Sequence, residues 1–235
     1  MEKVLYLVSA DGAGGADELG ARLRGPVADR LRELGAHGVQ VNVADTDVAP
    51  AASLRIATSA APADAAVGVW VDSAVAHLRT PFDTAISLGA EGASVAGYLV
   101  TESVPMVNER FPAEPGERTH GLAQLAFLQR PEGQSVEEWL RIWHDSHTQL
   151  AFDLQHTFAY VQNVVTRVLT PGATPWHAIV EECFPPAAMT DPHVFFDAVG
   201  DDERLARHQT QMFESVQRFI DLSKIEVIPT SRYLL

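Results

Sequence analysis

The sequence predicts an α+β fold built from two successive repeats, each with the order strand, helix, strand, strand, helix, strand. The first observation is an alternation of two patterns along the chain. Short apolar runs are typical of strands, and the longer stretches between them have apolar residues every three or four positions, as helices do. The second is that this order of elements occurs twice in 235 residues. The third is a content of 46% hydrophobic and 20% charged residues, which is enough apolar surface for a sizeable core.

The first repeat is predicted over residues 1–106. Apolar runs, several of them rich in valine, place its strands at Val4–Val8, Val39–Val43, Ala66–Asp72 and Ser94–Thr101. Leucines at helical spacing predict a helix over Asp17–Leu34 that Gly25-Pro26 breaks mid-way, and a short helix is expected over Pro81–Leu88. The DGAGGAD stretch at residues 11–17 lacks the spacing of a dinucleotide or P-loop fingerprint and predicts a turn with a helix start.

The second repeat is predicted over residues 120–235, after a proline-containing surface linker at residues 107–119. Its strands are expected at Gly121–Gln129, Phe158–Leu169, Trp176–Phe184 and Ile225–Pro229. Its helices are expected at Ser135–Gln155 and at residues 191–223. Each repeat is then a split βαβ unit of the ferredoxin-like kind. Two such four-stranded antiparallel sheets are expected to pack face to face, with the helices outside.

Charge and composition exclude several classes of partner. The net charge is −14, and so acidic a surface repels nucleic acid and anionic membranes. No apolar run approaches the ~20 residues of a membrane span, and the first residues are a poor match to a signal peptide. The single cysteine, Cys183, excludes an internal disulfide and any cysteine-rich metal site. We therefore expect a cytoplasmic protein with no membrane or nucleic-acid partner.

One predicted helix carries a histidine on its apolar face. Positions 136, 140, 143, 147, 150 and 154 form a stripe that must face the sheet, and His147 lies in its middle. Ser135 and Glu138 form a capping box that fixes the helix start. An imidazole in apolar surroundings needs a hydrogen-bond partner or a lowered pKa, and either suits a general acid or base. The alternative is a core histidine that a backbone carbonyl or a strand side chain satisfies. A metal pair with His144 is not expected, because the two rings lie on different faces.

The strands of the second repeat supply the candidate partners of His147. Tyr160 can hydrogen-bond the imidazole or a ligand carbonyl, and Gln124 can form part of a pocket wall. Either Glu181 or Glu182 must point inward, and a buried carboxylate beside His147 would complete an acid–base dyad. We take Glu181 as that carboxylate and leave Glu182 open.

Further side chains are candidates for contacts with a ligand. Asn163 lies on the opposite face of its strand from Tyr160 and is expected where the two sheets meet. Trp139 and Trp143 on the helix, and Phe213 near the C-terminus, supply apolar walls suited to an aromatic or fatty ligand. For each of these residues a purely structural role in the core is the alternative.

The second half resembles the EthD-type family of dimeric α/β-barrel proteins. The resemblance rests on SVEEWLRIWHDSHTQLAFDL followed by FAYVQNVV. The matching residues are Trp139, Trp143, His147, Leu150, Tyr160, Val161, Gln162 and Asn163. The first half carries Arg24-Gly25-Pro26-Val27 where the histidine-bearing turn should fall, so we interpret it as a degenerate repeat that replaces the second subunit of a family dimer. The resemblance thus implies a pseudo-dimeric α/β barrel with a small-ligand pocket between a sheet and its helices. It also implies, for most members, no organic cofactor, and roles in the breakdown of organic compounds or in aromatic polyketide pathways.

The function that these residues favour is cofactor-independent acid–base chemistry on a small apolar carbonyl or aromatic compound: dehydration, decarboxylation, cyclisation or isomerisation. His147 would transfer the proton and Tyr160 would orient the substrate. The alternative is a protein of the same fold that binds such a ligand without changing it. A haem-binding barrel is less favoured, since the GxxDG signature of dye-decolourising peroxidases is missing. No metal or cofactor is expected, and the protein is expected to be a monomer or a homodimer.

Overall fold

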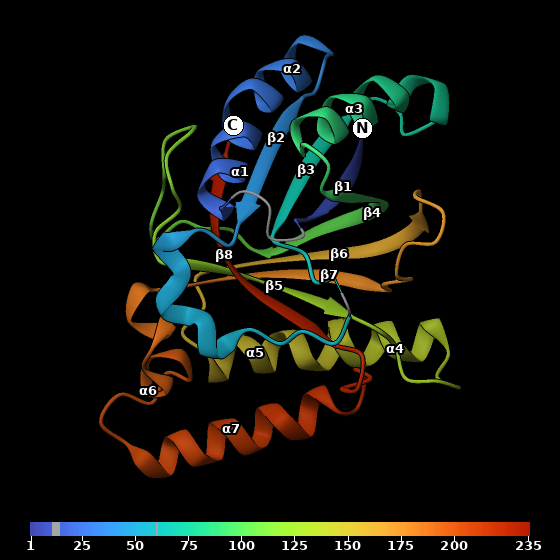
Figure 1. The fold of residues 1–235 in the computed structure, drawn as a ribbon. Helices are drawn as coiled ribbons and strands as arrows, with labels where there is room; N and C mark the ends of the chain where they lie inside the picture. The colour runs from blue at the N-terminus through green and yellow to red at the C-terminus, as the bar shows by residue number, and fades with distance from the viewer. Residues whose placement is uncertain (11–14, 60) are drawn as a thin grey trace.

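Eight antiparallel strands close into one barrel in the computed structural model, which describes residues 1–10, 15–59 and 61–235 (Figure 1). Around the barrel the strands follow the order β1-β3-β2-β8-β5-β7-β6-β4. Their bounds are β1 (Glu2–Ser9), β2 (Gly38–Val43), β3 (Ala65–Val71), β4 (Ser94–Met106), β5 (Leu122–Leu128), β6 (Ala159–Val168), β7 (Ala178–Phe184) and β8 (Glu226–Leu234). Each predicted strand is therefore present, in an α+β fold.

The two halves of the chain have the same strand order within the barrel. In each half the first strand lies between the fourth and the third, and the second strand pairs with the third. The halves are joined at two seams, where β2 pairs with β8 and β4 pairs with β6. The sheets thus meet edge to edge in a closed barrel, in addition to facing each other across its interior.

Two strands extend well beyond their predicted ends, and both form a seam. β4 continues from Thr101 to Met106, where it pairs with β6 as far as Tyr160. β8 continues past Pro229 to Leu234, and its last four residues pair with β2. Because these extensions are hydrogen-bonded to the other half of the chain, local sequence patterns carry little sign of them.

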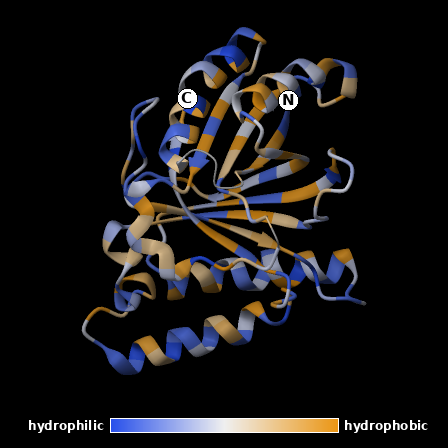
Figure 2. Cartoon of the chain, in the orientation of Figure 1, coloured by the Kyte–Doolittle hydropathy of each residue, from blue (hydrophilic) through white to orange (hydrophobic). Residues whose placement is uncertain are grey.

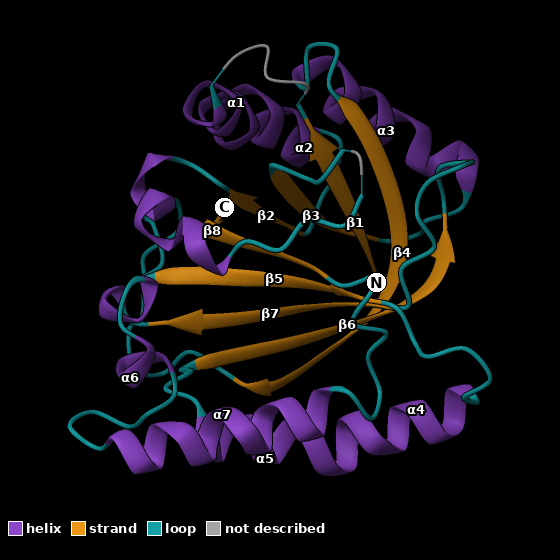
Figure 3. Ribbon diagram, turned by 60° about the horizontal axis from the view of Figure 1, so that its bottom comes forward, coloured by secondary structure: helices purple, strands orange, loops and turns teal. Residues whose placement is uncertain are grey.

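The helices cover the outside of the barrel in two groups (Figure 3). The first half contributes α1 (Ala16–Arg22), α2 (Ala28–Glu33) and α3 (Ala76–Gly89), and the second contributes α4 (Val136–Ile142), α5 (Thr148–Leu154), α6 (Pro192–Phe195) and α7 (Asp202–Val216). Short 3₁₀ segments lie at Thr46–Leu54 and Pro186–Met189. Within the described residues, no helix has both the length and the apolar character needed to cross a membrane.

The predicted helices differ from the observed ones in three places. The helix break predicted at Gly25-Pro26 is wrong, since a π-helical turn at Leu23–Val27 joins α1 to α2 without interrupting the helix. α3 begins at Ala76, five residues before the prediction, and contains Pro81. The region at 191–223 is two helices, α6 and α7, separated by a turn. Of the turn predicted at residues 11–17, residues 11–14 lie outside the described part of the chain, and α1 begins at Ala16.

Buried apolar side chains form three main layers, and hydrophobic and hydrophilic positions alternate along the strands in Figure 2. One cluster lies between the strands of the first half and α1 to α3, and a second lies between the strands of the second half and α4, α5 and α7. The third fills the interior of the barrel, where Phe127 packs against Trp176. The candidate site lies in the second layer, so it is separated from the interior by the sheet.

Candidate functional site

A π-helical turn places His147 on the sheet-facing side of its helix. The helix starts as predicted, because the Ser135 hydroxyl accepts a hydrogen bond from the backbone N–H of Glu138 at 3.1 Å. α4 then passes into a π turn at Trp143–His147 before α5 continues. The wider turn adds a residue and rotates the buried face.

The single apolar stripe predicted for this helix is therefore only partly right. Trp143 and His147 are buried, but Val136 at the start of the stripe is 53% exposed. Thr148, which lies outside the predicted stripe, is buried, and its hydroxyl donates to the carbonyl oxygen of Trp143 at 2.9 Å. A regular 3.6-residue period fails here because the π turn changes the phase of the helix.

His147 lies in apolar surroundings with one polar neighbour. Its Nδ1 lies 2.9 Å from the hydroxyl oxygen of Ser215 on α7, and its ring packs against Phe219 at a centroid distance of 4.7 Å. Burial and, to a smaller degree, the positive charge of Arg218 lower the pKa of His147 to about 4. The imidazole is therefore uncharged near neutral pH. Since Nδ1 is engaged with Ser215, Nε2 is the nitrogen left for a ligand.

A row of polar side chains crosses the sheet opposite His147. Gln124 on β5 pairs in register with Glu182 on β7, which pairs in turn with Tyr160 on β6. Burial raises the pKa of Glu182 to about 7, although a hydrogen bond with the Gln124 side chain opposes the rise. Burial and the nearby Glu182 raise the pKa of Tyr160, so its hydroxyl keeps its proton. The indole N–H of Trp143 donates to the Tyr160 oxygen at 3.2 Å.

These groups line one cavity of about 210 Å³ between the sheet and the helices. His147, Glu182, Tyr160, Gln124 and Gln155 are its polar members. The other lining residues are apolar: Ala126, Leu128, Trp143, Val180, Phe195, Phe196, Met212, Val216, Phe219, Ile220, Ile225 and Val227. Among the described residues no lysine or arginine lines it. The cavity thus suits a small, uncharged and mostly apolar molecule that carries one or two polar atoms.

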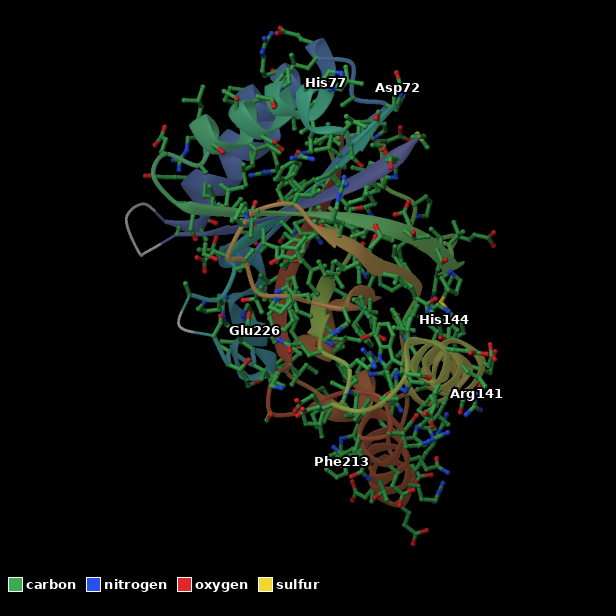
Figure 4. All side chains as sticks on the ribbon, turned by 90° about the vertical axis from the view of Figure 1, so that its right-hand side faces the viewer. Asp72, His77, Arg141, His144, Phe213 and Glu226 are labelled. Atoms are coloured by element: carbon green, nitrogen blue, oxygen red, sulfur yellow. The ribbon has the colours of Figure 1, made fainter. Side chains whose placement is uncertain are left out.

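Four of the eight residues predicted for the site line this cavity, namely His147, Tyr160, Trp143 and Gln124. Trp139 lies behind the wall, where its indole N–H donates to the carbonyl oxygen of Phe219 at 2.9 Å. Phe213 does not contribute, because its side chain is 57% exposed on the outer side of α7 (Figure 4). Met212 and Val216 are the α7 residues in the lining.

Glu181 and Asn163 face the barrel interior, away from His147. The Glu181 carboxylate accepts hydrogen bonds from Arg232 at 2.7 Å, from Gln40 at 2.6 Å and from Asn42 at 3.0 Å. Asn163 donates to the carbonyl oxygen of Ile179 at 3.0 Å. Successive residues of a strand point to opposite faces, so Glu182 is the glutamate in the His147 cavity, where we had placed Glu181.

Sequence reasoning missed Gln155, which lines the cavity. Gln155 follows the last residue of α5. No residue spacing connects it to β7, because the two segments meet only through the tertiary fold. The polar identity of Gln155 in a buried position, with 9% of its surface exposed, is the one local sign of a site.

The first half has the same helix geometry without the polar residues. Its π turn at Leu23–Val27 occupies the same place in the order of elements as Trp143–His147, and Val27 ends it where His147 ends the other. Val27 is buried against Gly89 on α3 so closely that a Cβ on Gly89 would lie 2.1 Å from a Val27 methyl. Apolar packing of Val27 against α3 therefore takes the place of the histidine in this half.

In the part of the chain that the structure describes, no three histidine, cysteine, aspartate or glutamate side chains are grouped so that they could hold a metal ion. Cys183 is buried on β7, and burial raises the pKa of its thiol to about 12, so it is a poor nucleophile.

Comparison with known proteins identifies the fold and leaves the family open. No family model matches the chain, and no curated protein matches it by sequence. Among solved structures, an anthrone oxidase-like protein superposes with a TM-score of 0.55 at 11% identity, over 100% of this chain and 91% of that one. Two proposed monooxygenases also match. The protein from Lactobacillus acidophilus NCFM has a TM-score of 0.45 at 10% identity over 98% and 92% of the two chains. The Fusobacterium nucleatum protein has a TM-score of 0.47 at 7% identity over 100% and 91%. At these identities the likeness concerns the fold alone.

Proposed function

We propose that the protein is an enzyme that needs no bound cofactor and performs acid–base chemistry on a small, largely apolar carbonyl or aromatic compound. The observation that carries the proposal is a pair of opposite pKa shifts in one cavity: His147 is lowered to about 4 and Glu182 is raised to about 7. Titratable groups whose environments move their pKa values in opposite directions are a mark of acid and base roles.

The two groups exchange their usual roles at mildly acidic pH. Between pH 4 and 7 the carboxyl group of Glu182 keeps its proton and the imidazole of His147 is neutral. Glu182 can then donate to a substrate oxygen while Nε2 of His147 accepts a proton from carbon. In an enolisation the C–H electron pair forms the C=C bond, the carbonyl oxygen takes the proton of Glu182, and imidazolium and carboxylate remain. The imidazolium then gives its proton to the alternative carbon while the enol O–H proton returns to the Glu182 carboxylate, which completes an isomerisation and restores both groups.

The remaining cavity residues orient the substrate. The phenol of Tyr160 remains protonated, and the donated hydrogen bond from Trp143 fixes the position of its oxygen. The Tyr160 hydroxyl therefore acts as a donor to a second oxygen of the substrate. Because no cation lines the cavity among the described residues, substrates without a carboxylate are favoured, and decarboxylation fits less well than isomerisation, dehydration or cyclisation.

We also propose that the chain is a tandem protein of the EthD-type dimeric α/β-barrel kind, with repeats at residues 1–106 and 120–235 and a linker at 107–119. Support comes from the shared strand order of the two halves and from the π turn present in each. The first repeat would be degenerate, since Val27 replaces the histidine. One chain would then carry one site.

A binding protein of the same fold is the second candidate, and the mostly apolar lining of the cavity favours it. Native mass spectrometry of the purified protein would show any bound molecule, haem included, and whether the chain is a monomer or a homodimer.

Catalysis and binding are distinguished by hydrogen exchange at carbon. A panel of uncharged one- and two-ring ketones and phenols is incubated with the protein in D₂O, and loss of C–H signals is followed by NMR. We expect exchange with the wild type, a large loss in His147→Gln and Glu182→Gln, and retention in His144→Gln, which changes a histidine of the same π turn outside the cavity. Binding without exchange would identify a binding protein, and exchange unaffected by either cavity variant would refute the acid–base roles.

A further inference from the structure

A second cavity of about 320 Å³ lies at one end of the barrel, on the other side of the sheet from His147. The end of β1, the starts of β4 and β8 and the loop at residues 170–176 surround it. It contains Glu226, which Figure 4 shows on the side of the molecule opposite His144 and Arg141. The proposed acid–base site makes no use of this cavity.

Glu226 is a buried carboxylate whose negative charge is only partly balanced by its neighbours. Only 3% of its surface is exposed. Its Oε1 accepts a hydrogen bond from the backbone N–H of Ser59 at 2.7 Å. Within residues 1–10, 15–59 and 61–235, its Oε2 receives no hydrogen bond, and no lysine or arginine lines the cavity or pairs with the carboxylate. A buried carboxylate is stabilised by a positively charged partner, so the cavity attracts a positive group.

The other walls suit an organic cation. Tyr98 and Trp176 contribute aromatic rings, and the faces of such rings attract ammonium groups. The Tyr98 hydroxyl donates to the carbonyl oxygen of Thr174 at 3.0 Å, which leaves its oxygen as an acceptor. The hydroxyls of Ser9 and Thr170 also lie at the cavity. The lining therefore combines one carboxylate, several acceptors and an aromatic surface.

We propose that this cavity binds a small organic ammonium ion, with its charged nitrogen on Glu226 and its carbon skeleton against Tyr98 and Trp176. A volume of about 320 Å³ is far larger than a single dehydrated metal ion needs. The net charge of −14 adds a long-range attraction for cations. This proposal is independent of the acid–base function, since it concerns a different cavity.

Calorimetric titration with benzylammonium chloride tests the proposal on the full chain at constant ionic strength. Benzyl alcohol serves as the uncharged probe of nearly the same shape. We expect saturable binding of benzylammonium with one site per chain and binding of the alcohol weaker by about tenfold or more, as expected for loss of a charge-assisted hydrogen bond. Glu226→Gln should weaken benzylammonium binding by about tenfold or more. Glu203→Gln removes an equal charge from the exposed surface of α7 and should leave the affinity unchanged.

A second variant keeps the test decisive if Glu226→Gln does not fold. Ala173→Leu leaves the carboxylate in place and fills part of the cavity from the loop at residues 170–176, so it should weaken binding. The proposal is overturned if benzylammonium does not saturate at millimolar concentrations, if the alcohol binds equally well, or if both variants keep wild-type affinity. Displacement of benzylammonium by potassium but not by sodium, at equal concentrations, would also overturn it, because it would identify a site for an inorganic cation.

Discussion

Replacing Glu182 with glutamine tests the electrostatics of the cavity without a substrate. Glutamine has the shape of the protonated carboxyl group and can keep the hydrogen bond with Gln124, but it cannot ionise. In the wild type, ionisation of Glu182 must occur in a buried site among apolar side chains. The variant therefore removes the pH-dependent free-energy cost of ionising a buried carboxyl group, and it leaves the packing almost unchanged.

The expected effect follows from the pKa of Glu182 in the two states. The ordinary value of 4.5 describes the unfolded chain and a value of about 7 describes the folded protein. Between these values Glu182 holds more protons in the folded state, so the contribution of Glu182 to the free energy of unfolding falls as the pH rises from 4.5 through 7. At about 1.4 kcal/mol per pKa unit, the fall amounts to about 3 kcal/mol. Glu182→Gln should show no such fall, and its stability relative to the wild type should rise by that amount between pH 4 and pH 8.5.

Urea unfolding followed by tryptophan fluorescence measures the difference, because Trp143 lies in the wall of the cavity. Both proteins contain His147, so its titration largely cancels in the comparison. Glu203→Gln is the matched control on the exposed surface, and its stability relative to the wild type should change little with pH. A difference between wild type and Glu182→Gln that stays constant from pH 4 to pH 8.5 would refute the reasoning, because it would mean that Glu182 ionises as easily in the folded protein as in water.

Three other substitutions test the surroundings of the site. Relative to the wild type, His147→Gln should gain about 3 kcal/mol of unfolding free energy as the pH falls from 6.5 to 4, because the folded wild type resists protonation of His147 and the variant has no such group; urea titrations at each pH measure the difference. Trp143→Ala should lower the unfolding free energy by about 3–5 kcal/mol and lower Tm, since Trp143 is completely buried. Arg232→Met should cost about 3–5 kcal/mol by leaving the Glu181 charge unpaired, and adding Glu181→Gln should recover much of this loss in denaturant unfolding.

The fold could be predicted from the sequence as far as the centres of the strands, and less well at their ends. Val39, Val41 and Val43 alternate with polar residues and form β2 as expected, because one face of that strand packs on helices. The final residues of β4 and β8 did not follow from local patterns, since the hydrogen bonds that extend them come from the other half of the chain. Closure of the barrel is a property of the two halves together.

The candidate site could be predicted to the level of the elements that form it. His147 and Tyr160 followed from their places on a helix and a strand, and they line the same cavity. The choice between Glu181 and Glu182 depended on which face of β7 meets the helices, and adjacent glutamates give no sign of that. The π turn was equally hidden, because WHDSH is compatible with an ordinary helix.

Glu181, which we had wrongly placed in the His147 cavity, helps to explain how Glu182 is positioned. Glu181 is held inside the barrel by Arg232 of β8 and by Gln40 and Asn42 of β2, so two strands, one from each half of the chain, anchor this point of β7. Glu182 is the next residue along β7 and points the opposite way. Its backbone is therefore fixed from the inner side of the sheet, while its carboxyl group lies among apolar side chains on the outer side. Because an exposed or mobile carboxyl group would recover its ordinary pKa, this anchoring from the first half supports the unusual protonation on which the proposed chemistry depends.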